Sequence, residues 1–288
     1  MAEQHVERVA YERSREKLAT IFIWTTAIVV SAMFCWIIFD LLRHGIRHLS
    51  WSFLLEAPRD AGRSGGIAPI IVATLWIVGV CMAVSLPIGL GTAVLLAEYT
   101  DDRNRFGRVV RRSLDALAAV PSIVFGLFGS ALFCVYLGMG FSILSGGLTL
   151  ACMVLPIFIR TAEDGLRSVP IDYRSGAAAL GISHATTLST ILLPMAAPAL
   201  IAGFALSVGR AMAETAALIF TSGYVDRMPS SLMDSGRALS VHIYDLSMNV
   251  PGGDGNAHAA ALVLVLLLLI VNTAALGLAR RWRRGTIA

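Results

Sequence analysis

The sequence predicts an all-α integral membrane protein with six transmembrane helices. Its 288 residues are 56% hydrophobic and only 15% charged, with a mean hydropathy of +0.73, whereas about a quarter of the residues in a soluble domain are charged. A helix needs roughly 20 mostly apolar residues to cross a bilayer. Six stretches meet or approach that length: 18–42, 68–96, 116–137, 143–159, 198–220 and 257–279.

The first apolar run is longer than the core of a secretory signal peptide, and no clear small-residue cleavage site follows it. We therefore expect a retained transmembrane helix (18–42) behind a tail of residues 1–17. The four cysteines lie in predicted spans without paired spacing, as small hydrophobic residues in helix packing do. The six histidines lack a ligand spacing such as HExxH, so the sequence predicts no metal site.

The distribution of basic residues predicts the orientation. Sixteen of the 23 lysines and arginines fall in segments that an even number of spans places on one side, and six fall on the other. Cytoplasmic loops are rich in Lys and Arg, so both termini are predicted to be cytoplasmic. The expected layout is then a periplasmic loop (43–67), a membrane core (68–279) and a cytoplasmic tail (280–288).

The cytoplasmic segment of residues 160–195 is patterned unlike a linker. A first short helix is expected after Pro170, ending at Gly181, because proline suits a helix start and glycine a helix end. A second is expected from the capping residue Ser183 up to Pro194. Two helices that meet at a glycine form an elbow, either a surface helix pair without a partner or a docking element for a cytoplasmic protein.

The spacing in this elbow resembles the EAA loop of ABC-importer membrane subunits, E-A-A, three residues, G, nine residues, I-x-L-P. Ser175 and Gly176 replace the Glu and the first Ala of that pattern, whereas the later positions agree. The resemblance implies that the elbow inserts into a groove of an ATP-binding subunit. The positions expected to couple to that subunit are Ser175, Gly176, Ala177, Gly181, Ile191, Leu193 and Pro194.

Longer motifs resemble one branch of these permeases. They are "LAAVPSIVFGLFG" (117–129), "LPIFIRTAEDGLRSVP" (155–170), "GRAMAETAALIFTSG" (209–223) and "SVHIYDLS" (240–247). Each is similar to the A-type permease of the bacterial high-affinity phosphate importer. This resemblance implies a type I ABC-importer permease fold in the inner membrane, with phosphate as substrate.

The resemblance also implies a set of partners. They are a second, related permease, a homodimer of ATP-binding subunits, a periplasmic phosphate-binding protein and the surrounding membrane lipid, with no nucleic acid. The chain's single lysine, Lys17, follows Glu16, so no G-K-[S/T] phosphate-binding loop can exist here. We expect no cofactor on this chain and ATP with Mg²⁺ on the partner ATPase.

Two ionisable residues, Arg210 and Glu214, interrupt the fifth apolar run, in which Arg210 is expected near the middle. Burying each at the centre of a bilayer costs roughly 2.5–3.5 kcal/mol. One interpretation is a self-neutralising pair, because positions i and i+4 share a helix face. The other is an anion path, in which the guanidinium fork meets two phosphate oxygens and Glu214 tempers its field.

Hydroxyls near that pair are further candidates. Thr215 continues the motif and Ser122 follows Pro121 in the third run. Thr221 and Ser222 either line the route or bond their own backbone, as hydroxyls in membrane helices commonly do.

Two further pairs of residues are candidates for structural or docking roles. Arg160 and Glu163 are expected to form an anchoring ion pair at the cytoplasmic end of the fourth span. His242 and Tyr244 lie in an outer segment, which either receives a substrate-binding protein or packs over the outer mouth.

Other functions stay open at the level of sequence. They are a permease for another oxyanion (phosphonate, sulfate or molybdate) and a membrane scaffold that relays phosphate status to a sensor kinase. A membrane enzyme is disfavoured, because no nucleophile–base constellation is present.

Overall fold

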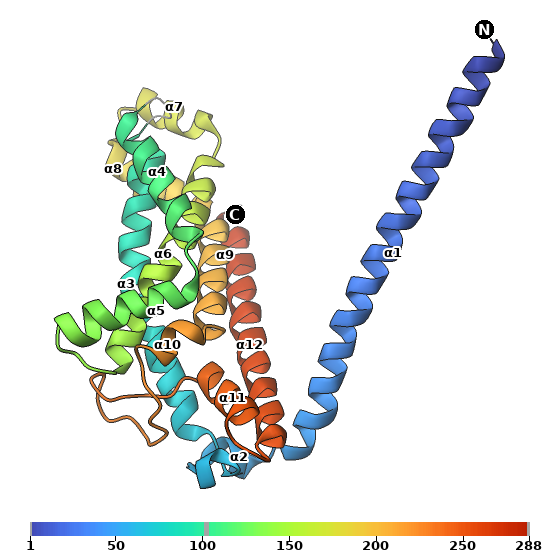
Figure 1. Cartoon of the computed structure of the whole chain (residues 1–288). Coiled ribbons are helices and arrows are strands. Elements are labelled where there is room, and N and C mark those ends of the chain that lie inside the picture. The colour runs from blue at the N-terminus through green and yellow to red at the C-terminus, as the bar shows by residue number, and fades with distance from the viewer. Residues whose placement is uncertain (1, 101–103, 287–288) are drawn as a thin grey trace.

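The computed structural model describes residues 2–100 and 104–286 and shows a helical bundle beside one long, separate helix (Figure 1). Arg103 of the basic segment and residues 287–288 of the predicted C-terminal tail lie outside the described residues. The long helix, α1 (Ala2–His48), includes residues 2–17 of the predicted N-terminal tail and the predicted first span, and Met1 lies outside the described residues. The other elements are α2 (Trp51–Leu55), β1 (Pro58–Arg59), η1 (Asp60–Gly62), β2 (Ser64–Gly65), α3 (Ala68–Glu98), α4 (Arg105–Ala118), α5 (Ser122–Gly129), η2 (Ser130–Tyr136), α6 (Ile143–Arg167), α7 (Ile171–Ala179), α8 (His184–Thr187), η3 (Leu188–Leu192), α9 (Leu193–Met212), α10 (Ala216–Ile219), α11 (Leu239–Met248) and α12 (Asp254–Thr286).

Among the described residues, five helices are long and apolar enough to cross a membrane. They cover Ala19–His48, Ala68–Glu98, Ile143–Arg167, His184–Met212 and Asp254–Ala279. A sixth crossing requires the pair α4 and α5–η2, which is bent by 100°. The predicted class, all-α with six crossings, is therefore confirmed with one crossing broken.

The third predicted span (116–137) is wrong as a single helix. The break falls at Pro121, which has no N–H to continue the ladder and pushes Val120 away from helical geometry. Residues 116–118 belong instead to α4, an amphipathic helix that carries four arginines. Only α5 and the π-helical η2 lie in the apolar part of that run.

The fifth predicted span (198–220) is also wrong as a continuous helix. α9 ends at Met212, residues 213–215 are not helical, and α10 is a single turn. At its other end this span begins earlier than predicted, because the second helix of the elbow does not stop at Pro194. α8 and the π-helical η3 run directly into α9, so Pro194 lies within one helical run, His184–Met212.

The core lies where α3, α6 and α9 pack together, and α12 covers α9. One apolar cluster joins Ile77 of α3, Leu150 of α6 and Val208 of α9. A second lies near α7 and includes Leu96, Leu166 and Leu192. These clusters make the bundle one rigid support for the residues that follow.

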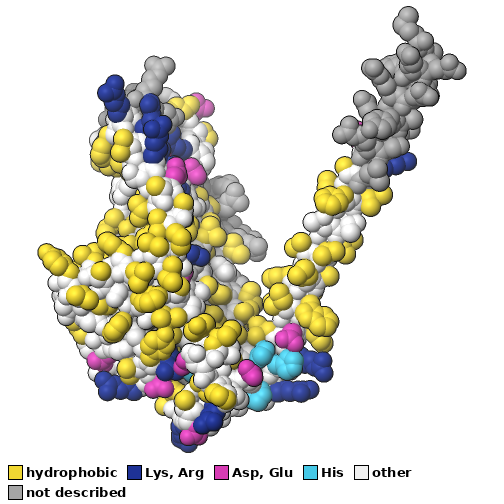
Figure 2. All heavy atoms as spheres, viewed as in Figure 1, with side chains coloured by type: hydrophobic (Ala, Val, Ile, Leu, Met, Phe, Trp, Pro, Cys, Tyr) yellow, Lys and Arg dark blue, Asp and Glu magenta, His cyan; other side chains and the backbone are white. Residues whose placement is uncertain are grey.

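The two ends of the bundle differ, and we call them the α7 end and the α11 end. In Figure 1, α7 and α8 lie at one end, and α2 and α11 at the other. The short hairpin of β1 and β2 follows α2, with Pro58 opposite Gly65. On the face shown in Figure 2, charged side chains gather at both ends, and hydrophobic side chains cover most of the band between. This is the surface of a protein that spans a bilayer.

Candidate translocation and coupling sites

Arg210 lies in the last turn of α9, not in the middle of a continuous span as expected. Its side chain is 49% exposed, and one guanidinium nitrogen lies 3.6 Å from Glu214 Oε2. The same nitrogen, Nη2, is 3.9 Å from Met153 Sδ on α6. The predicted contact between Arg210 and Glu214 therefore forms, but about half of the arginine side chain faces outward from this chain.

Glu214 lies in the break after α9, and its side chain is only 6% exposed. Its Oε1 accepts a hydrogen bond from the Ala217 N–H, 3.3 Å away, at the start of α10. Its backbone carbonyl accepts one from the Ser240 hydroxyl of α11. Glu214 thus satisfies backbone and side-chain donors where the helix is interrupted, as a buried break requires.

The predicted hydroxyl residues do not all join this pair. Thr215 is half-buried and directly precedes α10. Ser122 is half-buried in the first turn of α5, and in the described structure it forms no hydrogen bond or ion pair with Arg210 or Glu214. Thr221 and Ser222 donate to the carbonyls of Ala217 and Leu218, 2.8 and 3.2 Å away. Those two hydroxyls therefore bond their own backbone.

The elbow forms at the α7 end much as its turn signals predict. Pro170 precedes α7, and Gly181 takes a left-handed φ of +71°, which an L side chain rarely adopts. Ser183 caps α8 by accepting a hydrogen bond from the Thr186 N–H at 3.2 Å. Ser175, Gly176 and Gly181 are exposed and Ala177 is buried, while Ile191, Leu193 and Pro194 are half-buried.

One buried ion pair ties the elbow to the bundle. Arg174 of α7 donates from Nη2 to Glu98 Oε1 at 2.6 Å and from Nε to Oε2 at 3.2 Å. It also donates to the carbonyls of Leu166 and Val169, 2.9 and 2.8 Å away, where α6 ends. Glu98 is the last residue of α3, and its side chain is 2% exposed. A single arginine therefore joins α7 to two membrane helices.

A second charged cluster, centred on Glu163 of α6, lies near the same end. The predicted pair with Arg160 forms at 3.9 Å. Closer partners are Arg111 of α4 at 2.7 Å and Arg167 at 3.1 Å. Arg160 also pairs with Asp115 of α4. The cluster fastens the amphipathic α4 to α6, so α4 and α7 are both held on the ends of the core helices.

The outer surface of the elbow is apolar in an otherwise polar part of the molecule. Ile171 is 70% exposed and Leu180 is 79% exposed, at the beginning and the end of α7. Tyr173 between them is 46% exposed. Uncovered large hydrophobic groups beside charged ones are typical of a protein-binding surface.

Comparison with known proteins agrees with this geometry. Residues 85–285 match the family described as binding-protein-dependent transport system inner membrane component. The chain belongs to this family of importer permeases. It is also 31% identical to a probable ABC transporter permease, YqgI, of Bacillus subtilis, over 93% of this chain and 94% of that protein.

Relatives of this permease include named phosphate transport proteins. It is 33% identical to the phosphate transport system permease PstA 1 of Mycobacterium tuberculosis, over 74% of this chain and 70% of that protein. It is 32% identical to PstA of Haemophilus influenzae, over 75% and 76%. The predicted similarity to that branch is thus confirmed.

Solved importers share the fold of the permease. A bacterial ABC transporter that imports the acidic polysaccharide alginate superposes with a TM-score of 0.66 at 12% identity, over 95% of this chain and 99% of that one. The inward-facing MetNI methionine transporter gives 0.56 at 16% identity, over 75% and 94%. Identities this low establish the type I importer fold and not the substrate.

Sequence reasoning missed Glu98, Arg174 and Arg111, which help to position the permease's sites. Glu98 and Arg174 are 76 positions apart, and Arg111 lies 52 positions from Glu163, for which the sequence predicted only Arg160 as partner. In the sequence the one signal of the Glu98 pair is an acid near the end of an apolar run, and that does not identify its partner. His242, expected in an outer loop, is instead only 1% exposed in α11, whereas Tyr244 is 44% exposed.

Proposed function

We propose that this permease is the membrane subunit of an ATP-driven importer that carries inorganic phosphate from the periplasm to the cytoplasm. The similarity to PstA proteins over about three quarters of the chain supports phosphate as the substrate. The observation that carries the proposal is the position of Arg210, half exposed at the end of a membrane helix.

An outward-facing guanidinium within a bilayer is costly unless it meets water, an anion or a partner protein. A related second permease against this face would enclose Arg210 in a path between the two subunits. The planar fork of arginine matches two oxygens of a phosphate. Glu214, 3.6 Å away, would weaken the field enough to release the anion, and could accept a hydrogen bond from protonated phosphate. Thr215 and Ser122 would supply hydroxyls along this path.

The same proposal assigns a side of the membrane and a partner protein to each end of the permease. The α7 end would be cytoplasmic, with both termini, and the apolar elbow would dock a homodimer of ATP-binding subunits that hold ATP and Mg²⁺. The elbow positions named from the sequence, Ser175 to Pro194, would form this contact. The α11 end would face the periplasm and receive a phosphate-binding protein.

The first test is phosphate uptake by cells that carry Arg210→Gln. Losing one charge-assisted contact of about 1.5–3 kcal/mol predicts a drop in uptake of about 10- to 100-fold. Assembly with the partner subunits is expected to stay intact, and co-purification of the subunits measures it. Arg112→Gln is the matched control. Arg112 is exposed on α4, which the proposal assigns neither to the elbow contact nor to the binding-protein face, so this variant is expected to transport normally. Undiminished uptake by Arg210→Gln would contradict the proposed path.

A further inference from the structure

In the described part of the chain, the helix α1 meets the bundle near the α11 end. Figure 1 shows it standing apart from the bundle over most of its length. Its large apolar side chains are uncovered, with Phe22 and Trp36 both 72% exposed. Its substantial packing contact is with α12. The interactions between α1 and α12 therefore set the angle of α1 relative to the bundle.

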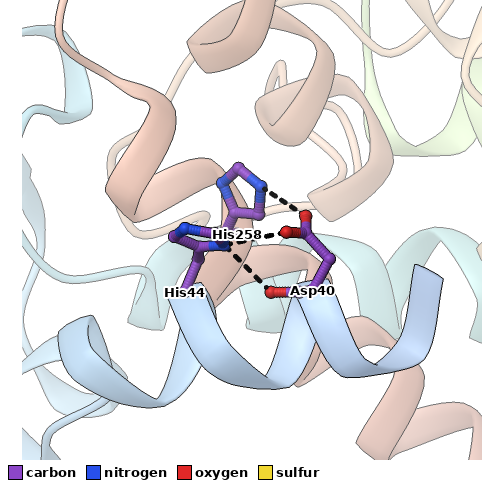
Figure 3. A group of neighbouring side chains, drawn as sticks. All are labelled: Asp40, His44 and His258. Carbon is purple, nitrogen blue, oxygen red and sulfur yellow. Dashed lines mark hydrogen bonds and ion pairs between the residues drawn. The ribbon is translucent and has the colours of Figure 1, made fainter. Parts of the chain in front are cut away.

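The contact rests on a close approach of two backbones. A Cβ added to Gly45 of α1 would lie 2.9 Å from the carbonyl oxygen of His258 on α12. Asp40 and His44 lie one turn apart on α1, and Figure 3 shows both converging with His258. One ligand atom from each of the three lies within 4.8 Å of the others.

The Nε2 atom of His258 faces Asp40 while a backbone carbonyl holds its other ring nitrogen. Its Nδ1 lies 2.6 Å from the Asp254 carbonyl oxygen, which can only accept, so Nδ1 carries the hydrogen. Nε2 lies 3.8 Å from Asp40 Oδ2, so a cation at this gap, a ring proton or a metal ion, would join the two groups. An imidazole oriented by a carbonyl through its other nitrogen is also the usual arrangement of a metal-bound histidine.

The second histidine completes a three-ligand set. His44 Nδ1 lies 3.1 Å from Asp40 Oδ1 and 3.1 Å from the Asp40 backbone carbonyl, so a metal ion bound through this nitrogen would displace the hydrogen that it shares with them. Ligands around a tetrahedral zinc ion, at about 2.0–2.2 Å from the metal, lie a little over 3 Å apart. The side chains of Asp40 and His44 are each 47% exposed, so they can adjust, and water can fill a fourth position.

We propose that Asp40, His44 and His258 bind one Zn²⁺ ion that clasps α1 to α12. Two imidazoles and one carboxylate suit a borderline first-row cation, whereas Ca²⁺ and Mg²⁺ prefer all-oxygen sets. The site lies at the α11 end, away from Arg210 and from the elbow. It needs neither the substrate nor the ATPase of the proposed function.

The clasp is tested on the full-length permease in detergent, stripped with a chelator and titrated with Zn²⁺, or with Co²⁺ as a spectroscopic probe. We expect one ion per chain and visible Co²⁺ absorption typical of four-coordinate N/O ligands. His258→Gln and Asp40→Asn should each weaken binding by about 10- to 100-fold or more. His48→Gln is the matched control, because His48 follows His44 by one turn but packs against Gly255. No binding at micromolar Zn²⁺, or equal binding by all four proteins, would overturn the site.

A second measurement tests the clasp without relying on affinity. Spin labels at Ile28 and Leu269, both exposed on α1 and α12, report the distance between the helices once Cys35→Ser removes the exposed native thiol. Adding Zn²⁺ should narrow the distance distribution, and a chelator should reverse this. Zn²⁺ that leaves the distribution unchanged would contradict the clasp.

Discussion

Arg210 and Glu214 are tolerated because each lies at a helix end and not in the middle of a span. Arg210 is in the last turn of α9, where the helix dipole favours a cation. Glu214 precedes α10 and accepts the hydrogen bond from Ala217 N–H. The sequence located both charges but predicted one continuous helix around them, because the residues that flank the break are as apolar as those of a span.

Two substitutions of Glu214 distinguish a structural role of this residue from an electrostatic one. Glu214→Gln keeps an oxygen for the Ala217 N–H and removes the charge, so we expect normal assembly with altered phosphate uptake. Glu214→Ala loses the acceptor as well and is expected to cost about 1 kcal/mol of stability. Thermal unfolding and uptake, measured on both variants, check this. Equal uptake by Glu214→Gln and the unmodified chain would leave the carboxylate with a structural role alone.

Glu98 is the most consequential residue that the sequence did not identify. Removing one partner of a buried ion pair costs about 3–5 kcal/mol, so Glu98→Gln should loosen α7 from α3, while the bonds from Arg174 to the end of α6 stay. We expect ATP hydrolysis in the assembled complex to become uncoupled from transport. Glu56→Gln is the control: its pair with Arg59 at 3.5 Å is exposed, and such pairs contribute about 0–1 kcal/mol. If ATP hydrolysis stays coupled to transport in Glu98→Gln, the ion pair between Arg174 and Glu98 is not what connects α7 to the membrane helices.

At the scale of elements, apolar length and turn residues predicted most of the architecture. The elbow followed from Pro170, Gly181 and Ser183, because these residues act locally on backbone geometry. The 100° bend between α4 and α5 could have been read from Pro121. The stop at Met212 could not, since part of what satisfies this break comes from another element, the Ser240 hydroxyl of α11.

The exposed apolar residues of α7 and its C-terminal cap give an element-scale prediction. Leu180→Asp should weaken association with the ATP-binding subunit about tenfold or more, because a charge would replace an anchor at the docking surface. The fold should survive, since Leu180 is 79% exposed. Met248→Asp, at a 71% exposed site on α11, is the matched control and should bind normally. Co-purification of the subunits measures both, and equal recovery with Leu180→Asp would remove α7 from the interface.

At the scale of the whole molecule, much apolar surface is left uncovered by this chain alone. From Ala19 onward most of α1 is exposed, and an apolar groove of about 680 Å³ lies between α3, α9 and α12, lined by residues such as Leu90, Phe204 and Ile270. Lipid and a second permease are the partners that would cover such surfaces within a bilayer. The hydrophobic periodicity of one sequence predicts which residues are apolar, but it does not predict how this chain packs against other chains.

Stability should fall on acidification because of His242. Burial, reinforced by nearby Arg237, lowers the pKa of His242 from 6.5 to about 4. The folded state therefore keeps this ring neutral between pH 6.5 and 4, while the unfolded state binds a proton. Stability is full above pH 6.5 and declines as the pH falls toward 4, by on the order of 3 kcal/mol. Thermal unfolding at pH 7.5 and 5 measures this, and His242→Gln should flatten the difference. If the stability of His242→Gln declines equally between pH 7.5 and 5, the pH dependence comes from other titratable groups.

Selective coupling to phosphate is the central claim, and ATP hydrolysis by the reconstituted complex tests it most directly. The complex would contain this permease, its related permease, the ATP-binding subunits, and either a phosphate-binding or a sulfate-binding protein with its anion. We expect phosphate with its binding protein to stimulate hydrolysis and sulfate with its own to leave it at the basal rate. Equal stimulation by both anions would contradict the account.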